Sequence, residues 1–130
     1  MIIGLGTDVV NIGRVERAYQ RYGKKFTEKL FTEQEQKDVT SVSEDKRAYK
    51  VAKLFAAKEA ASKALGTGFS GGIAWSDIEI SHDKSGRPLL IFHNKALKQA
   101  QKITGGDAFS AWLSLSDDYP LAQAVVVLEK

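Results

Sequence analysis

A carboxylate and an ammonium group stand on the apolar side of a predicted helix, where uncharged side chains would be expected. Glu59 falls in the middle of the apolar stripe predicted for residues 44 to 65, and Lys63 lies one turn further at its edge. Burial of a charge is unfavourable unless the group is paired or binds a metal ion. The spacing therefore indicates either a Glu59–Lys63 salt bridge, the simpler interpretation, or a functional site.

A second carboxylate, Asp8, follows a stretch with few side chains on one face. Residues 2 to 7 alternate as in a β-strand, with one face formed by Ile2, Gly4, Gly6 and Asp8. Glycines inside a strand often mark the close approach of another backbone or of a ligand. We therefore expect Asp8 at the rim of an open surface, although an ordinary turn aspartate would also fit.

Three residues have the type and position of helix N-caps: Asn11, Thr32 with Glu35 three residues later, and Ser43. They predict helices over about 12 to 22, 33 to 39 and 44 to 65, the last ended by glycines. These helices and the strand at residues 2 to 7 must bring Asp8, Glu59 and Lys63 together if the three residues form one site.

The second half of the chain predicts mainly β structure. Strands are expected near 77 to 80, 88 to 92, 109 to 116 and 121 to 128, with a helix capped by Asn94 among them. We expect Leu97, Ala100 and Ile103 of that helix to face inward. The order of elements predicts one α+β domain over residues 1–130, with a largely antiparallel sheet packed against a long helix and shorter helices.

Composition excludes several classes of protein. The 130 residues are 43% hydrophobic and 27% charged, which is ordinary for a globular chain and unlike a disordered one. No cysteine is present, so disulfide scaffolds, zinc knuckles and thiol nucleophiles are excluded. The first apolar run is broken at Asp8, too early for a signal peptide or a membrane span. We expect a cytoplasmic protein with no membrane partner.

The histidines, the glycine-rich segments and the tryptophans do not indicate further functional sites. His82 and His93 have no partner at metal-ligand spacing, so a histidine metal site or a catalytic triad is not expected. The glycines near residues 4 and 66 lack the arrangement of a dinucleotide or phosphate-binding loop. Trp75 and Trp112 are interpreted as core or interface anchors rather than as a platform for nucleic-acid bases.

Positive charge is concentrated near the N-terminus. Residues 11 to 30 hold six basic and two acidic residues, against a net charge of +3 for the whole chain. Spacings of three, four and four place four of the cations on one face: Arg14, Arg17, Arg21 and Lys25. Such a face would suit an acidic helix as partner, although a solvated helix face gives the same pattern.

Two segments together resemble the signature motifs of the 4′-phosphopantetheinyl transferases: GLGTDVV at residues 4–10 and FAAKEAASKALGTG at 55–68. The short chain, the DIEI segment at 77–80 and the GRP turn at 86–88 resemble the small bacterial branch, the holo-acyl-carrier-protein synthase family. The resemblance runs from residue 2 to residue 129. The second motif is long and specific, whereas the first is weak alone.

The resemblance implies transfer of the 4′-phosphopantetheine of coenzyme A to a serine of apo-acyl carrier protein, in fatty acid biosynthesis. It further implies dependence on Mg²⁺ and a homotrimer with active sites at the subunit clefts. By motif, Asp8 and Glu59 become the metal ligands and Lys63 a pyrophosphate contact. The coenzyme A site would also include Ser62, Gly66, Thr67, Gly68 and Pro88.

Physical reasoning agrees with these roles. Mg²⁺ prefers oxygen ligands and often takes only one or two carboxylates. Lys63 would stabilise charge on the departing bisphosphate, and we expect Glu59, directly or through a water, to accept the serine proton. Acyl carrier proteins are small and acidic, so the basic face of Arg14 to Lys25 becomes the docking face, with Phe26 as an apolar anchor.

The sequence departs from the family pattern at one position, and two other functions would also use some of these residues. Many family members carry a histidine near the C-terminus where this chain has the segment SLSD at residues 114–117, so Asp117 could replace it. A non-catalytic module binding an acidic protein or RNA would explain the basic face but not Glu59. A Mg²⁺-dependent phosphohydrolase could use the same two acids, although such sites usually gather more carboxylates.

Overall fold

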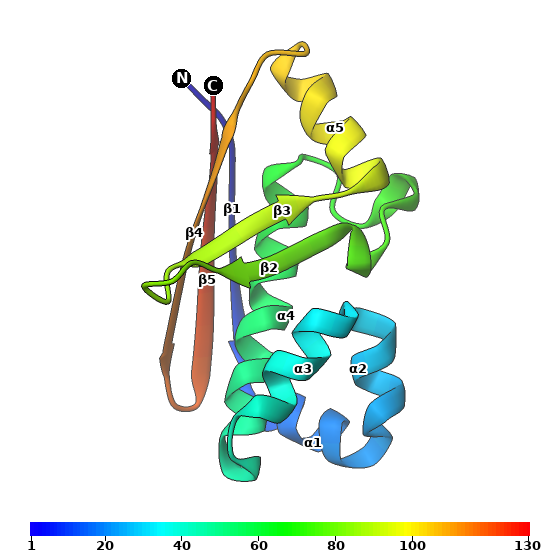
Figure 1. Cartoon of the computed structure of the whole chain (residues 1–130), viewed down its shortest axis with the longest axis vertical. Coiled ribbons are helices and arrows are strands. Elements are labelled where there is room, and N and C mark those ends of the chain that lie inside the picture. Colours follow the sequence, from blue (N-terminus) through cyan, green and yellow to red (C-terminus); the bar gives the residue numbers. More distant parts are fainter.

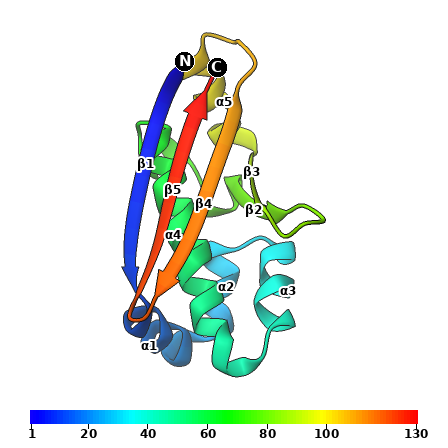
Figure 2. The ribbon, with the colours of Figure 1, turned by 90° about the vertical axis from the view of Figure 1, so that its left-hand side faces the viewer.

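An antiparallel sheet of three long strands forms one layer of the computed structural model, which describes residues 1–130 (Figure 1). Strands β1 (Ile2–Asn11), β4 (Ser110–Asp118) and β5 (Leu121–Glu129) lie in the order β1-β5-β4. Figure 2 shows the three strands face on, with the two chain termini side by side and helix α4 behind the sheet. Each strand pair is antiparallel, as the sequence predicts.

The long helix α4 (Arg47–Ala64) packs against one face of this sheet through the glycines of β1. A Cβ atom on Gly6 would overlap the carbonyl oxygen of Ala60, and one on Gly4 would overlap that of Ala64. The expected open surface beside Asp8 is therefore wrong along these glycines, because the backbone of α4 occupies it. Glycine here permits a strand and a helix to approach each other more closely than any side chain would allow.

Helix α4 is buried on most of its circumference, which corrects the single apolar stripe predicted for it. Its small residues Ala52, Ala56, Ala57 and Ala60 are fully buried between the sheet and the rest of the molecule. Glu59 lies at the border of this buried surface and is only partly buried. The helix also begins later than expected, since residues 44–46 form a 3₁₀ turn and Ser43 makes no side-chain cap.

Three short helices lie around the N-terminal end of α4 in Figure 1: α1 (Ile12–Tyr22), α2 (Lys24–Leu30) and α3 (Glu33–Ser41). Two predicted caps are confirmed. The side chain of Asn11 accepts a hydrogen bond from the Arg14 amide at 3.1 Å, and Thr32 with Glu35 forms a complete capping box. The sequence analysis missed α2, which Gly23 separates from α1 by adopting a positive φ of 53°.

A second, two-stranded antiparallel sheet pairs β2 (Ile78–His82) with β3 (Pro88–Phe92), and α5 (Asn94–Thr104) follows it. His93 rather than Asn94 stands at the N-cap of α5, and the Asn94 amide donates to Asp77 instead. Leu97 is more than one-third exposed, so its expected inward position is wrong, whereas Ala100 is buried. The α+β class is confirmed. None of the helices combines the length and apolar character needed to span a membrane.

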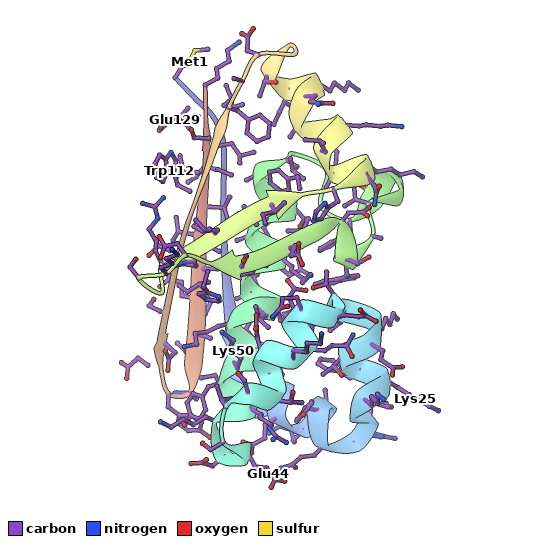
Figure 3. All side chains as sticks on the ribbon, viewed as in Figure 1. Met1, Lys25, Glu44, Lys50, Trp112 and Glu129 are labelled. Carbon is purple, nitrogen blue, oxygen red and sulfur yellow. The ribbon has the colours of Figure 1, made fainter.

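The face of the three-stranded sheet that points away from α4 carries apolar side chains on β1 and β5, and on β4 it carries Trp112 between exposed serines. The register places Leu5, Val127 and Trp112 in one row across β1, β5 and β4. Leu5 is 64% exposed and Trp112 is 44% exposed, as is typical of a surface that a partner could cover. The Trp112 indole donates a hydrogen bond to the Glu129 carboxylate at 2.8 Å, and both residues are labelled in Figure 3.

Candidate active site at the junction of β1 and α4

Asp8 and Lys63 meet across the close contact between β1 and α4. The Lys63 ammonium lies 3.0 Å from Asp8 Oδ1 and also donates to the Thr7 carbonyl oxygen at 3.0 Å. The simpler interpretation of the sequence, a Glu59–Lys63 salt bridge, is therefore not what the structure contains. Lys63 pairs with the carboxylate on the strand, and Glu59, one turn earlier on α4, makes no ion pair.

Glu59 carries a negative charge that is poorly compensated. Burial raises its pKa above the ordinary value, the nearby Asp8 carboxylate raises it further, and Lys63 lowers it in part. The two carboxylates line one cavity and lie close enough to repel each other. Such a pair is a natural place for a cation to bind, and a raised pKa also makes the carboxylate a stronger base.

The donors available here suit Mg²⁺ better than a softer metal ion. The structure contains no group of three or more histidine, cysteine, aspartate or glutamate side chains that could hold a metal. Mg²⁺ is commonly held by one or two carboxylates, with waters and substrate oxygens completing its shell. Asp8 and Glu59 fit this requirement and are the residues that would hold the ion.

A cavity of about 410 Å³ opens beside the two carboxylates. Its lining includes Asp8 of β1, Glu59 and Phe55 of α4, and two residues of the short helices, Arg14 of α1 and Phe26 of α2. Its walls are mainly apolar, and Arg14 adds a cation to the lining that also contains the two acids. The structure therefore joins the predicted metal ligands to one end of the predicted docking face.

The predicted single helix face is interrupted at Gly23, so Arg14, Arg17 and Arg21 lie on α1 whereas Lys25 lies at the start of α2. Arg14, Arg17, Arg21 and Lys25 are all exposed, and Figure 3 shows Lys25 at the outer side of α2. Phe26, which is half-buried, lines both the cavity at Glu59 and a smaller one shared with Lys25. The cations are therefore accessible, and Phe26 links the cavity that holds the carboxylates to the one beside Lys25.

The structure does not bring every predicted coenzyme A residue to this cavity. Gly66, Thr67 and Gly68 form the loop that leaves α4 just after Lys63, with the Gly68 amide bonded to the Ser62 carbonyl. Ser62 itself is fully buried, and its hydroxyl donates to the Glu59 carbonyl oxygen at 2.7 Å. It supports the backbone beneath Glu59 instead of facing the cavity.

Pro88 lies in a different cavity of about 420 Å³. That cavity is lined by Lys50, Lys53 and Arg87 as well as by Ser114, and it shares no lining residue with the one at Asp8. Asp117, on β4, is 3.4 Å from the Lys53 ammonium and so also belongs to this part of the molecule. In a single chain, these residues are not part of the site at Glu59.

The sequence analysis missed a buried ion pair beside the site. Lys58, the residue before Glu59, lies 2.8 Å from Glu35, and both side chains are fully buried. Glu35 was assigned only to a capping box, and Lys58 received no role. The available signal was a second charged residue within a helix segment otherwise rich in alanine.

Comparisons with known proteins agree with the motifs. Residues 4–124 match the 4′-phosphopantetheinyl transferase superfamily, and the chain belongs to this family. The "Holo-[acyl-carrier-protein] synthase" of Brucella ovis is 43% identical over 130 residues, which are 99% of this chain and 96% of that protein. The recognition made from the sequence is confirmed.

Solved structures of such synthases have the same fold. The crystal structure of holo-[acyl-carrier-protein] synthase from Neisseria meningitidis is 35% identical, covers 100% of both chains and has a TM-score of 0.84. The synthase of Bacillus anthracis, determined in complex with CoA (3′,5′-ADP), is 34% identical, covers 100% of this chain and 98% of its own, and has a TM-score of 0.81.

Proposed function

We propose that the protein transfers the 4′-phosphopantetheine group of coenzyme A to a serine of apo-acyl carrier protein. The products are holo-acyl carrier protein and adenosine 3′,5′-bisphosphate, and the reaction belongs to fatty acid biosynthesis in the cytoplasm. The observation that carries this proposal is the pair of mutually repelling carboxylates, Asp8 and Glu59, in a cavity that also contains Arg14. Relatives that match nearly the whole chain are holo-acyl-carrier-protein synthases.

Asp8 and Glu59 would hold a Mg²⁺ ion. When bound, the ion supplies positive charge that neutralises the pyrophosphate of coenzyme A and polarises the phosphorus under attack. Lys63 is already at this position, paired with Asp8 at 3.0 Å, and its flexible ammonium can turn to the oxygens of the departing bisphosphate. Displacement at phosphorus depends mainly on such positioning and charge, so a small set of residues is sufficient.

Glu59 is our candidate for the group that accepts the serine proton. Its raised pKa, caused by burial and by the nearby Asp8 carboxylate, makes it a stronger base than an exposed glutamate. The apolar walls formed by Phe26 and Phe55 limit water around it. The proton moves from the serine hydroxyl to a Glu59 carboxylate oxygen as the oxygen–phosphorus bond forms and the bond to the bisphosphate breaks.

The carrier protein would dock on α1 and the start of α2. Arg14, Arg17, Arg21 and Lys25 offer an exposed basic surface to an acidic helix, and Phe26 offers an apolar contact. Because Arg14 also lines the cavity at Glu59, a carrier held there would present its serine to the proton acceptor. Charge complementarity of this kind mainly increases the association rate and fixes orientation.

Two features support a homotrimer with active sites at the subunit interfaces. The outer sheet face exposes Leu5 and Trp112, a surface that a monomer would leave in water. The basic cavity around Pro88 and Arg87 is separate from the carboxylates of the same chain. If each site is completed by a second copy, one coenzyme A molecule can contact both sets of residues.

The test of the proposed activity is release of adenosine 3′,5′-bisphosphate from coenzyme A as the protein, an apo-acyl carrier protein and Mg²⁺ are combined. A carrier whose acceptor serine is replaced by alanine serves as the matched control. We expect release that requires both Mg²⁺ and the acceptor serine. Release that proceeds equally with the control carrier would instead indicate a phosphohydrolase, and no release with either carrier would reject the proposal.

A further inference from the structure

Lys58 is a fully buried lysine whose three donor positions are all used. Its ammonium contacts Glu35 Oε1 at 2.8 Å, the Trp75 carbonyl oxygen at 2.9 Å and the Ile78 carbonyl oxygen at 2.5 Å. Burial lowers the pKa of Lys58, and the nearby carboxylates of Glu35, Glu79 and Asp77 raise it in part. The charge is therefore held in place by a complete set of oxygen partners.

Glu35 is equally satisfied. Its Oε1 atom accepts from the Thr32 amide at 2.8 Å as well as from Lys58, and Oε2 accepts from the Ile80 amide at 2.8 Å. No buried side-chain nitrogen or oxygen of the protein lacks a partner. The two side chains consequently tie together α3, α4, the 3₁₀ turn at Trp75 and strand β2, which lie side by side in Figure 1.

A buried ion pair is a poor source of stability. The free energy needed to remove two charges from water often exceeds the free energy gained from their attraction. A protein with apolar residues of the same volume in place of the pair is frequently as stable. Lys58 is fully buried, and its ammonium lies 5.8 Å from the centre of the Phe31 ring, so an apolar side chain of similar length such as methionine would be accommodated in its place. The hydrogen bonds of Lys58 and Glu35 are directional, so they fix the orientation of the two side chains, which apolar contacts would not do.

That orientation matters because Lys58 directly precedes Glu59. Consecutive residues point about 100° apart around an α-helix, so fixing Lys58 toward β2 fixes the direction of Glu59 toward β1. On the other side of α4, the glycine contact at Gly6 and Ala60 sets the distance between helix and strand. A rotation of α4 by about 20° would move a group about 6 Å from its axis by about 2 Å.

We propose that the buried Glu35–Lys58 pair is a positioning device that sets the rotation of α4 and so directs Glu59 at Asp8 and the reacting phosphate. This inference rests on the proposed function in assigning catalysis to Glu59, but the positioning itself can be measured without any transfer reaction. Displacements of about 1 Å at a reacting group can lower a rate by about 100-fold, so a rotation of the size given above would strongly affect turnover.

The test variant is Glu35→Gln with Lys58→Met, which removes both charges and leaves no single charge buried without its partner. Val51→Ala is the control, because it removes buried methyl groups from the same helix two turns before Glu59 and leaves the pair intact. Both are compared with the native protein well below their unfolding temperatures. Glu35→Asp, which keeps the charge but shortens its reach, replaces the double variant if that variant does not fold.

Two readouts decide the result. We expect the double variant to lose at least about tenfold in kcat with KM for coenzyme A and carrier within about twofold of native, while Val51→Ala keeps its kcat. We also expect the backbone amide NMR signals of Asp8 and Lys63, which do not adjoin a substituted residue, to shift in the double variant and not in Val51→Ala. Unshifted signals, a native kcat or an equal loss in both variants would overturn the proposal.

The amide signals separate this proposal from the proposed function. If the native protein transfers nothing, the proposed function fails, and the presence or absence of the shifts still decides whether the pair positions α4.

Discussion

Replacing Gly6 by alanine tests the contact that brings the two carboxylates together. The added methyl group would overlap the Ala60 carbonyl oxygen and lie 2.8 Å from the Ala64 amide nitrogen. Both are backbone atoms of α4 and cannot rotate away, so the helix must move from the strand. Overpacking a core destabilises proteins by about 1–3 kcal/mol, and we expect a loss of about 3 kcal/mol because no flexible side chain can absorb the overlap.

The size of the effect on thermal unfolding follows from chain length. An unfolding entropy of about 2.1 cal/mol/K per residue gives about 0.27 kcal/mol/K for a chain of 130 residues, so a loss of about 3 kcal/mol lowers Tm by about 11 °C. The assay is thermal unfolding followed by circular dichroism at one protein concentration, because assembly would make Tm depend on concentration. Transfer per folded molecule is measured in parallel and should also fall, since Asp8 lies two residues from Gly6.

Gly13→Ala is the matched control. In the first turn of α1, an added Cβ meets only the Asn11 side chain at 3.1 Å and the end of Arg17 at 3.4 Å, and alanine restricts the unfolded chain more than glycine does. We expect its Tm to equal or exceed that of the native protein. A Tm for Gly6→Ala within about 3 °C of native would refute the argument that α4 is held against β1 by backbone contact.

Three further changes probe the charges and the sheet. Glu59→Gln should lose transfer by more than about 100-fold. The pKa of Glu59 is higher in the folded protein than in the unfolded chain, so ionising Glu59 destabilises the fold. This destabilisation is complete above the folded pKa and absent below the unfolded pKa of about 4. Denaturant unfolding should therefore show Glu59→Gln to be more stable than native at neutral pH and equal to native below about pH 4. Arg21→Glu, at a docking residue that does not line the cavity at Glu59, should raise the carrier KM about tenfold in steady-state assays and leave coenzyme A binding unchanged; weaker coenzyme A binding instead would contradict the docking face. Leu5→Glu, on the exposed sheet face, should reduce the assembly to monomers by light scattering, and an unchanged mass would exclude that face as the subunit interface.

Local signals in the sequence were sufficient for much of the fold. The caps at Asn11 and Thr32 depend on residues three positions apart, so the bonds they make can be read from spacing alone. Strands β2 to β5 lie close to their predicted bounds, whereas β1, predicted over residues 2 to 7, continues to Asn11. Helix α2 was missed because a seven-residue helix after Gly23 has too little periodicity to be seen.

The sequence predicted the residues of the site because their charges interrupt apolar segments. It did not predict which side chains these residues pair with. Asp8, Glu59 and Lys63 stand out in the sequence, whereas the Asp8–Lys63 pair joins positions 55 residues apart and depends on how α4 lies on β1. Lys58 was overlooked because lysine is ordinarily exposed, and its partner Glu35 lies on another helix. Tertiary packing, which spacing does not encode, decides both cases.

The central claim is that Asp8 and Glu59 together support phosphopantetheine transfer. The most direct measurement is the intact mass of an apo-acyl carrier protein after incubation with coenzyme A, Mg²⁺ and either the native protein or the double variant Asp8→Asn with Glu59→Gln. We predict that the carrier gains the mass of one phosphopantetheine group with the native protein and none with a folded double variant. Equal mass gain with both proteins, or no gain with the native protein, would contradict the claim.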